Sequence, residues 1–149
     1  MADSRVRLQV EDWVRTEWLR THFNQHFGRE RLVLEAGGVF DFDAVSLDKS
    51  IVAVISTSGA LTSSGKQASA KLHKIRADML FLMMLPSCRN RLVVLTEKSM
   101  YDRLIREKEI GRVPEAINFL HAEIPSDLRA SLDAAHNDSS DEIRVRPSM

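Results

Sequence analysis

Three consecutive segments decide the fold: GGVFDFDAVS (Gly37–Ser46), LDKSIVAVISTSG (Leu47–Gly59) and SGKQASAKLHKIRADMLFLMML (Ser64–Leu85). The first two contain short apolar runs separated by a turn, which predict neighbouring strands, and the third predicts an amphipathic helix after a loop of small residues. The first run also carries two acids, Asp41 and Asp43. A carboxylate in an apolar strand is costly unless a cation or a metal pairs with it, so both are candidate site residues.

Outward from this unit, the chain reads as helix, three-strand meander, helix, strand, helix, strand, helix. The predicted helices cover Ser4–Phe27, Ser64–Leu85, Ser99–Glu107 and Ser126–His136, and the predicted strands cover Arg31–Ala36, Val39–Ser46, Ile51–Ser56, Arg91–Thr96 and Ile117–Ile124. The first three strands are joined by connections too short for a crossover, so they must run antiparallel. Adjacent strands followed by helices predict an α+β (mixed α/β) fold with helices covering the sheet.

The length of 149 residues allows one core, which we place in a single domain over residues 1–136, followed by a polar, mobile tail at 137–149. No apolar run approaches the roughly 20 residues of a membrane span. The N-terminal sequence lacks the apolar centre of a secretory signal, and the single cysteine, Cys88, provides no disulfide framework. We therefore expect a cytoplasmic protein without a membrane partner.

The charge is balanced overall but uneven locally. The chain has 21 basic and 21 acidic residues, which argues against strong sequence-independent binding to nucleic acid, because such binding needs many phosphate contacts. Yet Lys66, Lys71, Lys74 and Arg76 follow one another with no acid before Asp78. This run is either a solvated helix face or a surface that binds nucleic acid.

The predicted order of helices and strands, and the central sequence motifs FDFDAVS, IVAVIST and SGK, resemble those of the PD-(D/E)XK nuclease superfamily, which has the restriction-endonuclease-like fold. The resemblance covers roughly Val10 to Leu95. It implies that an Asp on the second strand and a Glu on the third hold Mg²⁺ or Mn²⁺, while a Lys two residues after that Glu activates water. A Glu on the first helix often assists. Oxygen ligands suit such metals, which stabilise charge on the phosphate.

Carried over to this chain, the resemblance makes Asp43 the second-strand metal ligand, with Asp41 as an alternative on the same strand face. Glu17 matches the helix acid, because it falls within the apolar stripe of the first helix. The third strand departs from the pattern, since Val54 stands in place of the metal-binding Glu and Ser56 in place of the Lys.

This departure leaves two hypotheses open. In some members the Lys has moved to the helix after the third strand, and Lys71 at the edge of the apolar stripe is the candidate here. The chain would then be an impaired or altered metal-dependent phosphodiesterase that acts on nucleic acid. Alternatively, the fold is kept without catalysis, as a module that binds nucleic acid or a protein. The two missing groups favour the loss of ordinary nuclease activity.

Simpler interpretations also remain. Asp41 and Asp43 could face solvent on a half-exposed strand whose Phe40 and Phe42 face the core, and Glu17 could pair with an arginine such as Arg20. The apolar segment Ile117–Ile124 could serve as a sheet edge in a homodimer.

The segment from Gly59 to Lys66 invites comparison with a phosphate-binding Walker loop. Its two glycines are separated by one residue too many, and Gln67 stands where the Walker pattern needs Ser or Thr. An antiparallel meander before the loop also argues against this interpretation.

Overall fold

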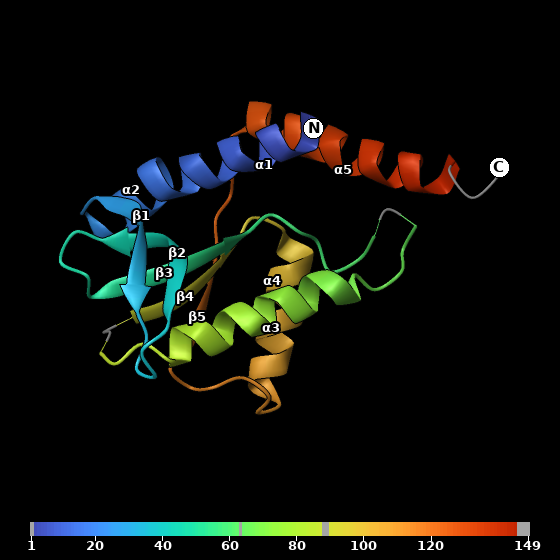
Figure 1. Cartoon of the computed structure of the whole chain (residues 1–149). Helices are drawn as coiled ribbons and strands as arrows, with labels where there is room; N and C mark the ends of the chain where they lie inside the picture. Colours follow the sequence, from blue (N-terminus) through green and yellow to red (C-terminus); the bar gives the residue numbers. More distant parts are fainter. Residues whose placement is uncertain (1, 63, 88–89, 146–149) are drawn as a thin grey trace.

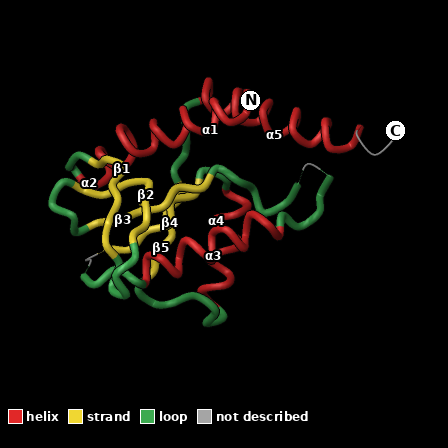
Figure 2. The backbone as a smooth tube through the Cα atoms, viewed as in Figure 1, coloured by secondary structure: helices red, strands yellow, loops and turns green. Residues whose placement is uncertain are grey.

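A five-stranded mixed sheet lies between two layers of helices (Figures 1 and 2). The computed structural model describes residues 2–62, 64–87 and 90–145. The strands are β1 (Phe27–Val33), β2 (Val39–Ser46), β3 (Ile51–Ser56), β4 (Asn90–Leu95) and β5 (Ile117–His121). The helices are α1 (Ala2–Trp13), the π-helical turn η1 (Val14–Trp18), α2 (Leu19–Phe23), α3 (Ser69–Met83), α4 (Lys98–Glu109) and α5 (Ser126–Val145). The mixed α/β architecture expected from the sequence is confirmed.

The order of the strands across the sheet follows their order in the chain. β1, β2 and β3 pair antiparallel, as their short connections predict, whereas β3, β4 and β5 pair parallel through the crossovers that contain α3 and α4. β1 and β5 are therefore the two edge strands. None of the described helices has the length and apolarity needed to cross a bilayer.

Each face of the sheet is buried under its own helical layer. On one face, side chains such as Val54 and Val93 pack with residues of α3 and α4. On the other, side chains such as Ile55 and Val94 pack with residues of α1 and α5. Burial on both faces explains why β3 and β4 are continuous apolar runs rather than alternating ones.

The first helix ends earlier than its sequence suggests. Asn24 adopts a left-handed conformation (φ 54°) that terminates α2, so Gly28 is not the stop signal. The chain then enters β1 at Phe27, which places this strand ahead of the predicted Arg31–Ala36. Asparagine is one of the few residues other than glycine that adopts this conformation readily, and the sequence analysis overlooked it.

The last helix is longer than expected. α5 continues through residues predicted to form an irregular tail and reaches Val145, so the predicted end at His136 is wrong. At the other boundary, α3 begins only at Ser69 rather than near Ser64. The intervening loop carries an isolated bridge between Leu61 and Gln67.

Candidate functional site

Strand β2 separates from strand β3 at Asp43. β2 pairs with β1 along its length, but it pairs with β3 only through Ala44 and Val45, and the β1–β2 register shifts near the same place. Beyond this point the N–H of Ile55 donates to Oδ2 of Asp43 at 2.8 Å. The carboxylate thus takes the place of a backbone acceptor where the two strands separate.

Arg15 fixes the backbone of the same residue from the helical side. Its Nε donates to the main-chain oxygen of Asp43 at 2.6 Å, and its side chain is mostly buried. Arg15 lies in the π-helical turn η1. Such wide turns interrupt the regular helical register and often occur at functional sites. Both the backbone and the side chain of Asp43 are therefore held in place.

Glu11 of α1 lies within electrostatic reach of Asp43. Burial raises the pKa of the Glu11 carboxyl above its usual value, and the negative charge of Asp43 raises it further. The positive charges of Arg15, Arg29 and Lys74 oppose this rise. Glu11, not Glu17, is thus the acid of the first helix whose pKa is raised by the charge of Asp43 on the second strand.

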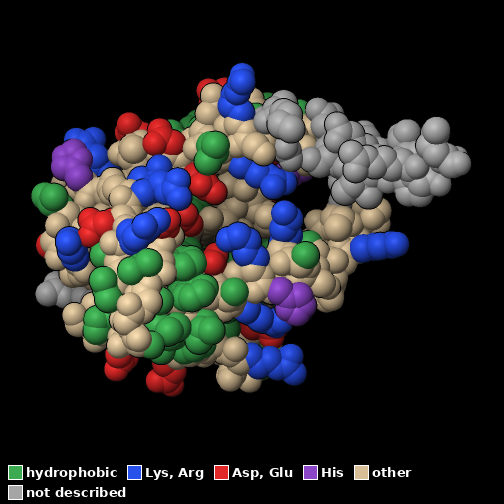
Figure 3. Space-filling model, in the orientation of Figure 1, with side chains coloured by type: hydrophobic (Ala, Val, Ile, Leu, Met, Phe, Trp, Pro, Cys, Tyr) green, Lys and Arg blue, Asp and Glu red, His purple; other side chains and the backbone are tan. Residues whose placement is uncertain are grey.

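A third carboxylate, Asp78 of α3, approaches from the opposite side. Burial raises the pKa of Asp78, Lys74 lowers it, and Asp43 adds a smaller upward shift. Lys74 Nζ lies 3.1 Å from Asp78 Oδ2, with the lysine side chain 74% exposed and the aspartate side chain 15% exposed. The space-filling view shows acidic and basic side chains around a hollow between the α1/α5 layer and α3 (Figure 3). We call Glu11, Asp43, Lys74 and Asp78 the cleft cluster, because these electrostatic effects and the Lys74–Asp78 ion pair link the four side chains.

The carboxylates of the cleft cluster are spread rather than convergent. Among the described residues, only Glu97, Asp133 and His136 form a group of potential ligands whose atoms all lie within 4.8 Å of one another. A cation in the cleft would therefore keep part of its hydration shell, which is the usual behaviour of Mg²⁺ in proteins.

Two of the predicted metal ligands lie apart from the cleft cluster. Asp41 forms a two-point ion pair with its cross-strand neighbour Arg31, with oxygen–nitrogen distances of 2.8 and 3.2 Å. This pairing holds the pKa of Asp41 below its usual value. Glu17 is exposed on η1, because the wide turn shifts the helix faces relative to a regular 3.6-residue wheel. Asp43 alone of the predicted ligands takes part in the cluster.

The third strand supplies no metal ligand at Val54, where the resemblance to the nuclease superfamily would place a Glu. Val54 is 3% exposed and belongs to the core beneath α3 and α4. Ser56 ends β3, where its hydroxyl accepts from the N–H of Ser58 at 3.3 Å. Lys71, the predicted replacement for the missing lysine, is exposed on α3, and Lys74 one turn later takes the position beside an acid of the cleft.

The four residues of the predicted basic surface do not all point the same way. Lys66 and Lys71 are exposed, and Lys74 lies at the cleft. Arg76 instead reaches α4, where its Nη2 lies 2.7 Å from Oε1 of the buried Glu107. Arg76 therefore serves a buried ion pair in addition to any surface role.

Sequence reasoning missed Glu11, Arg15 and the role of Asp78. The spacing of Lys74 and Asp78 by one helical turn was a usable signal, because such residues are neighbours on a helix surface. Nothing comparable in the sequence connects Glu11 to Asp43, since their proximity depends on the docking of α1 against the sheet.

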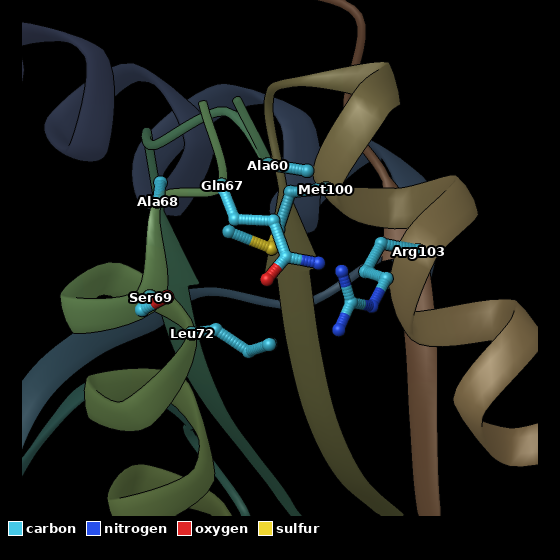
Figure 4. Close-up of a pocket in the computed structure, with 7 residues that line it drawn as sticks. All are labelled: Ala60, Gln67, Ala68, Ser69, Leu72, Met100 and Arg103. Carbon is cyan, nitrogen blue, oxygen red and sulfur yellow. The ribbon is translucent and has the colours of Figure 1, made fainter. Parts of the chain in front are cut away.

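The loop before α3 does not form a Walker arrangement. Gly65 (φ +84°) and Lys66 close a turn on Thr62, and they precede the helix instead of opening it. Beside this loop is a small cavity between the start of α3 and α4, in which the side chains of Gln67 and Arg103 extend toward one another (Figure 4). The cavity has no acidic lining residue, so it offers no metal ligands.

Comparison with protein-family models, with curated proteins and with solved structures gives no match to this chain.

Proposed function

We propose that this chain is a diverged nuclease-like protein that binds a divalent cation and a nucleic-acid backbone in the cleft, with altered phosphodiester hydrolysis as its activity. The observation that carries the proposal is the position of Lys74 and Asp78 on α3, across from Asp43. These two residues offer a cation and an acid near the second-strand aspartate, which are the two kinds of group that β3 lacks at Val54 and Ser56.

The donor set of the cleft suits Mg²⁺ or Mn²⁺. Glu11, Asp43 and Asp78 provide carboxylate oxygens, and a bound cation would offset the repulsion by which Asp43 adds to the burial-raised pKa values of Glu11 and Asp78. One oxygen of Asp43 accepts from Ile55, which leaves the other available. When bound, the cation would supply charge stabilisation to the scissile phosphate.

The residues of the chain itself would position the phosphate. Lys74 is mostly exposed at the rim, so its ammonium can contact a phosphate oxygen while Asp78 orients it. Lys71 lies one turn earlier on the same helix and Lys66 lies in the preceding loop, where they would contact neighbouring phosphates.

The first test is titration calorimetry of Mn²⁺ and Mg²⁺ into the wild-type chain and into Asp43→Asn and Asp41→Asn variants. Asparagine retains an acceptor for Ile55, so Asp43→Asn removes charge with little loss of structure. We expect Asp43→Asn to abolish metal binding and Asp41→Asn to leave it unchanged. Equal binding in all three proteins would exclude the cleft as the metal site.

The catalytic part needs its own assay. Labelled single- and double-stranded DNA and RNA are incubated with wild-type chain and with Lys74→Ala in Mn²⁺. We expect cleavage by the wild type and at least a tenfold loss in the variant, in line with the cost of one electrostatic group in a transition state. Cleavage that persists in both Lys74→Ala and Asp43→Asn would contradict the assignment.

A second function is a non-catalytic module that binds nucleic acid or a protein, and a specific observation favours it. Asp43 is already bonded to the N–H of Ile55, and Lys74 to Asp78, so the described groups satisfy one another without a metal. Metal binding separates the two hypotheses, because a silent module does not need it. Nucleic-acid binding that is unaffected by EDTA and accompanied by no metal uptake would favour the module.

A further inference from the structure

A second group of potential ligands lies where β4 ends and α5 crosses it. Glu97 follows β4, and Asp133 and His136 lie on α5. One atom from each of the three side chains lies within 4.8 Å of the other two. Two carboxylates and one imidazole therefore lie close together, although Glu97 is far from Asp133 and His136 in the sequence.

His136 is the member of this group whose hydrogen bonding is incomplete. Its Nε2 is buried from solvent and has no hydrogen-bond partner among the described residues. A buried polar nitrogen without a partner is uncommon in folded proteins and calls for a physical explanation. Burial also lowers the pKa of His136, which favours the neutral imidazole, the form that ligates metals.

Arg129 pairs with both carboxylates of the group. Its Nη1 lies 2.9 Å from both Glu97 oxygens and 3.2 Å from Oδ1 of Asp133, and its Nη2 donates to the carbonyl of Thr96 at 2.9 Å. No hydrogen bond among the described residues joins the Arg129 guanidinium to Nε2 of His136, so Arg129 does not satisfy that nitrogen. Arg129 is one-third exposed, so it has access to solvent.

We propose that Glu97, Asp133 and His136 form a binding site for a divalent transition metal of the zinc class, in competition with Arg129. Imidazole nitrogen with carboxylate oxygens is a ligand set that suits Zn²⁺ or Co²⁺ and not Mg²⁺, which takes oxygen ligands. Zinc–ligand bonds of roughly 2 Å separate neighbouring ligand atoms by about 3–4 Å, so the three atoms need to contract only slightly. Water would complete the coordination.

This proposal is independent of the cleft. The alternative is a purely structural clamp, in which Arg129 ties α5 to the end of β4 and His136 merely packs beside it. The two explanations predict opposite effects of removing Arg129. Loss of a competitor tightens metal binding, whereas loss of a clamp only weakens the fold.

The experiment is titration of Zn²⁺ into EDTA-treated, dialysed protein, with Co²⁺ absorption as a spectroscopic readout of coordination. We expect one zinc per chain, at least tenfold weaker binding in His136→Ala and in Asp133→Asn, and roughly tenfold tighter binding in Arg129→Ala, because one charge-assisted competitor is gone. His73→Ala, at an exposed histidine on α3, is the matched control and should bind like the wild type. Thermal unfolding of each variant verifies that it is folded.

Unchanged zinc affinity in both His136→Ala and Asp133→Asn would overturn the proposal, and so would a loss of binding in His73→Ala. Weaker binding in Arg129→Ala would also overturn the competition with the guanidinium. Asp43→Asn serves as a cross-control: it should leave zinc binding intact even if it abolishes Mn²⁺ binding, so failure of the cleft and failure of this site remain distinguishable.

Discussion

Two acids that pair with cations of α3, the partly buried Asp78 on α3 and the buried Glu107 on α4, have opposite surroundings. Each forms an ion pair with a more exposed cation of α3, Lys74 for Asp78 and Arg76 for Glu107. Asp78 has Asp43 as a further neighbour, so negative charge accumulates there. Glu107 has Arg103 and Arg112 at 3.6 Å, so positive charge accumulates instead. The comparison teaches that one acid paired with α3 has a second carboxylate as its neighbour, whereas the other is surrounded by three arginines.

The largest expected effect is on the free energy of unfolding when Glu107, the acid surrounded by arginines, is changed. Glu107→Gln should destabilise the fold by about 2 kcal/mol, because a nearly buried charge that accepts from Arg76 is replaced by a weaker acceptor. Urea unfolding followed by circular dichroism measures this. Addition of Mn²⁺ should not rescue the variant, because no carboxylate excess exists there. A stability equal to the wild type would show that the arginines are solvated equally well without Glu107.

Replacing a carboxylate of the cleft cluster with a neutral amide should stabilise the fold, in contrast to Glu107→Gln. Glu11→Gln should make the folded chain more stable than the wild type at neutral pH, because burial and Asp43 both penalise its charge. Since the folded-state pKa of Glu11 lies above its ordinary value of 4.5, the wild type loses stability as pH rises from 4.5 through the folded-state pKa. The advantage of the variant should therefore shrink as pH falls toward 4.5. Urea midpoints measured between pH 4 and 8 provide the curve.

A divalent cation sharpens the same comparison. If the cleft takes up Mn²⁺, the metal should stabilise the wild type and remove much of the advantage of Glu11→Gln at neutral pH. Thermal unfolding with and without Mn²⁺ tests this, with Glu107→Gln as a matched variant that keeps the cleft intact. Equal Mn²⁺ stabilisation of wild type and Glu11→Gln would remove Glu11 from the set of ligands.

The smallest effect concerns Asp41, whose two-point ion pair with Arg31 is exposed. Its lowered pKa contributes stability that is present above the unfolded-state value of 3.8 and is lost as pH falls through the folded-state value. Because exposed pairs are screened, Asp41→Asn should change the urea midpoint little at neutral pH, and less in high salt. A large loss of stability would mean that the hairpin depends on this pair for its register.

The fold was largely predictable, because its information is local. The apolar runs that became β2 and β3, and the stripe of α3, follow from periodicity within each segment, and short connections impose the antiparallel meander. Sequence also identified Asp43, since a carboxylate within an apolar strand requires an explanation. Boundaries were less predictable, as Asn24 and the long α5 show.

The site was only partly predictable, because it depends on relations between distant segments. A regular helical wheel selects Glu17, which the π-helical turn leaves exposed, whereas the docking of α1 against the sheet brings the charge of Glu11 near that of Asp43. The bonds from Arg15 to Asp43 and from Arg129 to Glu97 join residues far apart in the chain. Patterns within one segment carry no information about such pairs.

The bond from Ile55 to Asp43 gives the cleft a built-in reporter. An amide proton that donates to a carboxylate senses the charge of that carboxylate directly, so the ¹H–¹⁵N signal of Ile55 should move when Asp43 gains a proton or a cation. The rate at which the same proton exchanges with deuterated solvent would report how often the β1–β2 hairpin swings away from β3. One backbone resonance could thus follow both occupancy and opening in solution.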